Sequence, residues 1–183
     1  MSVLIEGISV VVRAEAILAS YPGGWEAFFE AVPNQTLCAD GELVRVGFMA
    51  PDDVQAYIEQ LEHSGLRFLL EGSAVDIVVV DQVRGPSTPC EWVEFGRIPY
   101  ERDEGRPVAA CRLRGSEIWQ LLCPTDWTWE HSLSNQFGFV PEEHFDKTMT
   151  RQRQEDGLDV YRSQLSDEDV FIGRTRDGKS LKE

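Results

Sequence analysis

The chain has 183 residues, 42% of them apolar, and carries a formal net charge of −15 at pH 7. So negative a surface repels nucleic-acid backbone and anionic lipid, and the apolar fraction is too high for a disordered acidic tail. We therefore expect a folded globular protein without nucleic-acid or membrane partners. The charge is concentrated in the first 100 residues, which hold 15 acidic and 5 basic residues.

The first half of the chain alternates between strand and helix patterns. A β-branched apolar run predicts a buried strand over 4–12, and a second strand is expected over 43–49. Apolar residues at helical spacing over 14–32, interrupted by Pro22-Gly23-Gly24, predict two short helices joined by a turn. The clearest helix begins at Pro51 and stops at Gly65. Its apolar stripe predicts one face packed on a sheet and consists of Val54, Tyr57, Ile58 and Leu61.

Later elements are mostly strands. We expect them over 67–70, 75–81, 91–95, 108–113 and 118–122. Residues 98–107, with four consecutive charges and a proline at each end, are the best candidate for a linker or exposed loop. Residues 158–162 and 169–174 predict a C-terminal β-hairpin. The order predicts an α+β fold, a mixed or antiparallel sheet with two or three helices packed on it, plus this hairpin.

Domain organisation follows from the same pattern. We expect one domain over residues 1–183, because a chain of this length can bury a hydrophobic core without disulfides or bound metal. A subdivision into an α+β layer over 1–97 and a C-terminal extension over 108–183 is the alternative. Residues 1–12 lack the basic region of a signal peptide, and no stretch approaches the roughly 18 apolar residues of a membrane span, so we expect a cytosolic protein.

No motif names a reaction. The four cysteines, Cys38, Cys90, Cys111 and Cys123, are too widely spaced for a metal knuckle and are expected to be reduced and structural. His131 and His144 lie in an acid-rich stretch without zinc-site spacing. We therefore expect no catalytic residue, no metal ligand and no cofactor. The tryptophan cluster is open to two interpretations, core packing or an interface, and comprises Trp119, Trp127 and Trp129.

Two resemblances are carried by short motifs. Val46-Gly47-Phe48-Met49 followed by Pro51-Asp52-Asp53-Val54 resembles the middle of a vicinal oxygen chelate (glyoxalase-like) half-module, whose remaining strands would be 8–12 and 75–95. Enzymes of that superfamily take histidine and glutamate metal ligands from their strands. Neither 4–12 nor 43–49 contains a histidine, so the resemblance implies at most a metal-free member or a convergent layer.

A second resemblance, to a family of small acidic bacterial proteins, implies no particular activity. Its motifs are Tyr21-Pro22-Gly23-Gly24, Val32-Pro33-Asn34, Cys38-Ala39-Asp40-Gly41, Arg45-Val46-Gly47-Phe48-Met49 and Pro89-Cys90-Glu91-Trp92.

The leading hypothesis is a cytosolic binding protein that inhibits or sequesters a more basic protein, in the manner of a toxin-immunity inhibitor. Acids on turns and helix ends would form the contact, with one tryptophan as anchor. These residues are Asp52, Asp53, Glu59, Glu62, Glu91, Glu94 and Trp92. The alternative is a glyoxalase-like small-molecule binder or metal-dependent lyase. Its pocket would be lined by Val46, Phe48, Val78, Val80 and Trp92, with Arg45 or Gln82 orienting the ligand.

Overall fold

The computed structural model describes residues 1–116, 120–136, 149–155, 158–163 and 169–173, the last three ranges as backbone. The chain divides into two compact units, Met1–Trp127 and Thr128–Glu183. The fold is α+β, as predicted from the order of the elements. Whether residues 1–183 form a single domain stays a prediction. No helix in the described ranges is both long and apolar enough to cross a bilayer.

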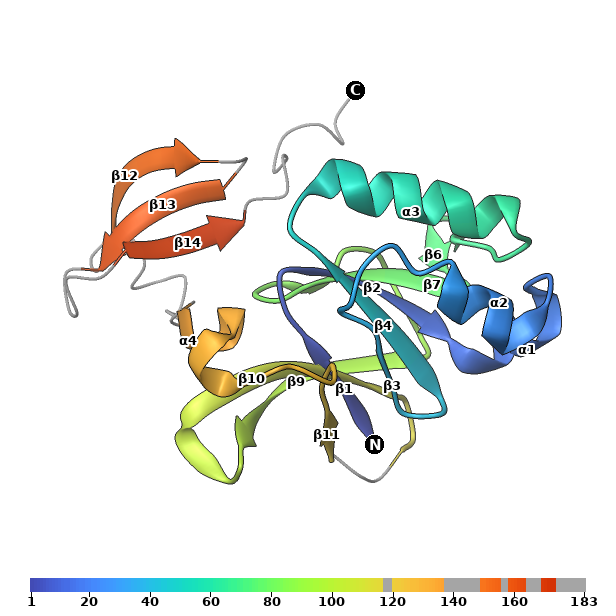
Figure 1. Ribbon diagram of the computed structural model, residues 1–183, viewed down its shortest axis with the longest axis horizontal. Helices are drawn as coiled ribbons and strands as arrows, with labels where there is room; N and C mark the ends of the chain where they lie inside the picture. Colours follow the sequence, from blue (N-terminus) through green and yellow to red (C-terminus); the bar gives the residue numbers. More distant parts are fainter. Residues whose placement is uncertain (117–119, 137–148, 156–157, 164–168, 174–183) are drawn as a thin grey trace. The chain divides into compact units, whose positions relative to one another are not determined.

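The first unit contains a five-stranded antiparallel sheet with three helices on one face (Figure 1). Its strands, in spatial order, are β3 (Cys38–Ala39), β4 (Leu43–Phe48), β2 (Ile8–Arg13), β7 (Ile77–Asp81) and β8 (Gly85–Pro86). The helices are α1 (Ala14–Ser20), α2 (Gly24–Glu30) and α3 (Pro51–His63). A separate small hairpin joins β5 (Leu69–Leu70) to β6 (Ser73–Ala74).

Alternation along β2 and β4 divides the core into two sides. Val10 pairs with Val46, and both pack beneath the helices together with the predicted α3 stripe. Side chains at alternate positions, Val11, Val78 and Val80, are fully buried on the opposite face. The central sheet is therefore buried on both faces, which explains its near-continuous apolar strands.

The predicted strand over 4–12 is in fact two strands. β1 (Ser2–Ile5) and β2 lie in different sheets, and the chain bends between them at Glu6-Gly7. Gly7 has a φ of 59°, a left-handed conformation that glycine adopts without steric cost. The bend leads the chain from the second sheet, which contains β1, into the central sheet, which contains β2. The spatial order of the second sheet is β11 (Leu121–Leu122), β1, β10 (Asp103–Leu113), β9 (Val93–Tyr100). β1 pairs parallel with β11 and antiparallel with β10, so this sheet is mixed.

The expected linker over 98–107 is wrong, because those residues form the distal part of the β9–β10 hairpin. Val108 pairs with Ile98, and the ladder reaches Asp103 and Tyr100 at the tip. Only the exposed turn was predicted correctly: Glu101 and Arg102 both adopt positive φ there. Charged side chains with prolines suit a hairpin tip as well as a linker, and sequence alone does not separate the two.

The second unit is described by itself. It contains a 3₁₀ helix, η1 (Trp129–His131), a short helix, α4 (Leu133–Gln136), and a three-stranded antiparallel sheet. The predicted C-terminal hairpin is confirmed as β13 (Leu158–Ser163) and β14 (Asp169–Gly173). The sequence analysis missed the third strand, β12 (Met149–Glu155), which pairs with β13. Its polar composition gives no apolar alternation to detect.

Candidate functional site: an acidic helical surface

Four of the predicted contact acids lie on α3. Asp52 and Asp53 occupy its first turn, and Glu59 and Glu62 its second half; all four are exposed. Because the buried stripe faces the sheet, the opposite side of the helix has to carry the polar residues. Asp52 and Asp53 also face the positive end of the helix dipole, which favours acids there. The structure therefore places these four carboxylates together on the outer side of one element.

Two further acids, not among the predicted contacts, extend this surface onto α2. Glu26 and Glu30 are exposed there, and the Gln60 side chain of α3 donates a hydrogen bond of 3.3 Å to the carbonyl of Ala31 at the end of α2. We call the six carboxylates the acidic helical surface: Glu26, Glu30, Asp52, Asp53, Glu59 and Glu62.

The acidic helical surface has no basic counterpart in its own sequence. Between residues 14 and 66 the sole lysine or arginine is Arg45, and it is buried, with 3% of its surface exposed. None of the six carboxylates takes part in a salt bridge within the described residues. Glu15, at the start of α1, differs because it bonds to Arg13. The signal that could have located the surface was this gap in basic residues.

Apolar side chains are exposed among these acids. Leu18 of α1 is 69% exposed, and Trp25 and Phe29 of α2 are 36% and 56% exposed. Their helical spacing had predicted the helices correctly but had not shown which members of the pattern were buried. Ile17 and Phe28 are the members that enter the core. The helical layer therefore presents both carboxylates and aromatic rings to solvent.

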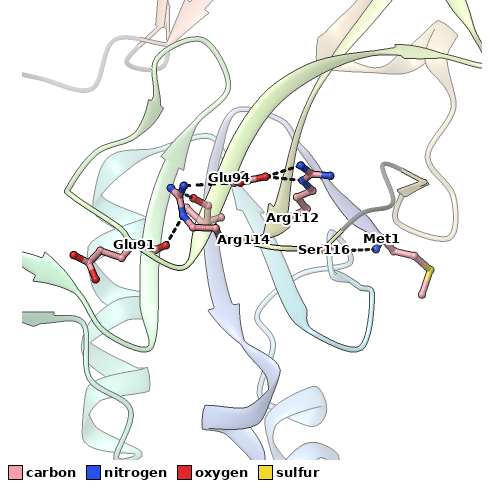
Figure 2. Close-up of polar contacts among 7 residues, drawn as sticks. Met1, Glu91, Glu94, Arg112, Arg114 and Ser116 are labelled. Atoms are coloured by element: carbon pink, nitrogen blue, oxygen red, sulfur yellow. Dashed lines mark hydrogen bonds and ion pairs between the residues drawn. The ribbon is translucent and has the colours of Figure 1, made fainter.

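Of the remaining predicted contacts, Glu94 lies on β9 in the second sheet and is paired within the chain (Figure 2). Glu91 and Trp92 lie just before β9. The Glu94 carboxylate accepts hydrogen bonds from Arg112, with nitrogen–oxygen distances of 2.7 Å, and lies 3.8 Å from Arg114. Arg114 also donates to the Glu91 carbonyl at 2.6 Å. The Glu91 side chain itself is exposed. This charge network joins β9 to β10 and leaves Glu94 a poor candidate for an external partner.

Trp92, the predicted anchor, is half-buried and already engaged. Its indole N–H donates to the carbonyl of Ala74 at 3.3 Å, and the Arg13 guanidinium lies 5.9 Å from its ring centroid. Because α3 and β9 belong to different layers, the structure divides the predicted site into two groups. The α3 group joins a larger surface, whereas Glu94 and Trp92 bond to other residues of the chain and the Glu91 side chain stays exposed.

A buried polar cluster lies on the face of the central sheet away from the helices. Arg45 donates from Nε to Ser9 at 2.8 Å, from Nη1 to the Thr36 carbonyl at 3.0 Å, and from Nη2 to the Glu6 carbonyl at 2.8 Å. Burial lowers the pKa of the Arg45 guanidinium, and the nearby charge of Glu6 opposes this shift. A Cβ at Gly47 would lie 2.4 Å from Nη2, so Gly47 provides the space for the guanidinium.

The pocket expected for a small-molecule binder is not assembled. Val46 and Phe48 pack under the helices, whereas Val78 and Val80 face the other side of the sheet. Arg45 is bonded within the chain as described, and the Gln82 side-chain oxygen accepts from the Gly7 backbone N–H at 2.8 Å. The strand alternation was the signal that should have separated these residues.

The four cysteines are free thiols of low reactivity. Cys38 and Cys111 are buried, and Cys90 and Cys123 are partly buried. Burial raises the pKa of all four thiols, that of Cys123 to about 12. A raised pKa leaves little thiolate to act as a nucleophile. In the described part of the chain no group of three or more His, Cys, Asp or Glu side chains could hold a metal ion. His144 lies outside the described residues.

The three tryptophans of the predicted cluster do not all lie in one unit of the structure. Trp127 donates from its indole N–H to the Glu6 carboxylate at 2.9 Å and contacts the Tyr100 ring edge-on at 5.1 Å, within the first unit. Trp129 begins η1 in the second unit, and Trp119 lies outside the described residues. Trp127 is therefore part of the packing of the first unit.

Comparison of the chain with protein-family models, curated proteins and solved structures gave no match. The two resemblances thus stay predictions, and the functional argument depends on the site.

Proposed function

We propose that this is a cytosolic binding protein that inhibits or sequesters a more basic protein, as an immunity protein does its toxin. The observation that carries the proposal is the acidic helical surface, where six exposed carboxylates lie among exposed aromatic rings without any lysine or arginine. Opposite charge on a partner would speed encounter and disfavour wrong partners, and the aromatic rings would supply the apolar part of the contact.

The contact surface in this proposal is the helical layer. Glu91, Glu94 and Trp92 are not included, since Glu94 and Trp92 are bonded within the chain and none of the three lies on α2 or α3. The proposal places the contact on α2 and α3 instead. It requires no cofactor and no catalytic group.

The test uses the tagged full chain to capture a basic protein from its host lysate, followed by titration of the two purified proteins. The variant Asp52→Asn/Asp53→Asn/Glu59→Gln/Glu62→Gln should weaken binding at least about tenfold and flatten its salt dependence. A control with the same charge change, Glu71→Gln/Glu91→Gln/Glu104→Gln/Asp126→Asn, should bind within about twofold of the wild type. Equal weakening by both variants, or binding that salt does not affect, would contradict the proposal.

A further inference from the structure

Trp25 and Phe29 form an aromatic platform on the outer side of α2. They are one turn apart and 36% and 56% exposed. The Trp25 ring stacks on the buried Phe28 ring, with a centroid distance of 5.9 Å and an interplanar angle of 24°. Tyr21 supports Phe28 edge-on at 5.4 Å. Trp25 is therefore held from the core side by packed rings while its other side meets solvent.

The platform has carboxylates beside it on the same helix. At 3.6 residues per turn, Trp25, Phe29, Glu26 and Glu30 share an arc of about 140° around the α2 axis. The faces of aromatic rings carry partial negative charge and attract cations, as do the carboxylates. Among the described residues, none of these four side chains takes part in a cation–π contact or an ion pair. The combination lacks only a cation.

Elsewhere the chain completes the same combination with its own arginine. The Arg13 guanidinium lies 5.9 Å from the Trp92 ring centroid and bonds to the Glu15 carboxylate. A guanidinium suits such a place because it is planar, stacks on rings and keeps its N–H groups free at the edges for a carboxylate. A lysine ammonium is more strongly hydrated and makes no such stack.

We propose that α2 is a recognition site for an arginine side chain of the partner, with the guanidinium on the Trp25–Phe29 platform and its N–H groups directed to Glu26 and Glu30. This inference rests on the proposed function and adds to it the chemistry of the contact. The occupant is an exposed arginine-bearing segment of a basic protein. Lysine at the same position binds more weakly, although the net charge is equal.

The experiment titrates the full chain with capped hexaarginine and hexalysine peptides at low ionic strength by calorimetry. The arginine peptide should bind about fivefold more tightly. In the variant Trp25→Leu/Phe29→Leu the two affinities should become equal, with hexalysine affinity unchanged. Leu18→Ala is the matched control, since it removes exposed apolar surface from the same layer without removing a ring, and it should keep the preference.

Glu26→Gln/Glu30→Gln should weaken both peptides, whereas Glu71→Gln/Glu104→Gln, with the same charge change, should weaken them less. Equal wild-type affinities for the two peptides, or a preference that survives loss of both rings, would overturn the arginine site. Neither result touches the proposed function, which fails separately if the captured partner binds the α3 variant as well as the wild type.

Discussion

The helical layer and the interior between the two sheets hold charge in opposite ways. Inside, the single Arg45 guanidinium has a hydrogen-bond acceptor for each of its three nitrogens. Outside, none of the six carboxylates of the acidic helical surface has a salt-bridge partner in the described structure. Bonded charge in a buried place specifies one arrangement of the chain, whereas unpaired surface charge repels itself and adds little to stability. The interior charge therefore supports the fold, and the outer charge is available to a partner.

The largest effect should come from Arg45→Met. It leaves the oxygens of Ser9, Thr36 and Glu6 without their donor in a buried place, and we expect a loss of about 3 kcal/mol in the free energy of unfolding. Urea denaturation followed by circular dichroism measures it, with exposed Arg84→Met as a control that changes the same charge. An unchanged midpoint would show that the cluster does not hold the sheets.

Gly47→Ala tests whether the Arg45 guanidinium needs the space that Gly47 leaves. Its Cβ would collide with the Arg45 guanidinium, so we expect a loss of about 2 kcal/mol from overpacking. In the Arg45→Met background the same change should cost much less, because the colliding group is absent. A double-mutant cycle with additive losses would mean that Gly47 serves another purpose.

Alkaline pH distinguishes the interior from the surface in another way. The folded pKa of Cys123 is about 12 and its reference value is 9.0, so the folded state holds the proton more tightly. The resulting stability is complete below pH 9 and is lost as pH rises from there towards 12. The urea midpoint should fall between about pH 9 and pH 11, and Cys123→Ala should reduce that fall. An identical fall in both proteins would assign it to other groups.

Glu94→Gln tests the paired surface charges. The Arg112 and Arg114 side chains are 18% and 58% exposed, so water screens part of the interaction. We expect a loss of about 1 kcal/mol that shrinks at high salt. Glu104→Gln, at an exposed position of the same hairpin, should have no effect. A salt-independent loss would indicate lost packing instead of lost charge.

Neutralising the α3 acids should have the smallest effect on the fold. The fourfold variant described above should lie within about 0.5 kcal/mol of the wild type at low salt, because the relief of repulsion is offset by the lost interaction of Asp52 and Asp53 with the helix dipole. Thermal melts at low and high salt measure the difference. Destabilisation comparable to that from Glu94→Gln would mean that these carboxylates have structural partners, and the contrast between the two regions would be lost.

The sequence predicted elements well where one period dominated. The helix from Pro51, the break at Pro22-Gly23-Gly24 and the C-terminal hairpin were all confirmed. It failed at Glu6-Gly7, because an apolar run does not reveal that its two ends belong to different sheets. Four of the seven candidate contacts, those on α3, were found exposed and without a salt bridge in the described structure. Glu94 and Trp92 were not, because their partners Arg112 and Arg13 are distant in sequence and pairing depends on strand register.

The Glu6-Gly7 bend has a consequence for the order in which the first unit can form. β1 pairs with residues 109–111 and 121–122, so its neighbours are more than 100 positions away along the chain. During synthesis the helices and the β2–β4 pair can assemble early, while Ser2–Ile5 must wait for β10 to leave the ribosome. Contacts of such long range slow folding, because a large loop has to close before they form. Until then the apolar side of the central sheet that β1 will cover stays open, and that interval is when the nascent chain is most exposed to aggregation.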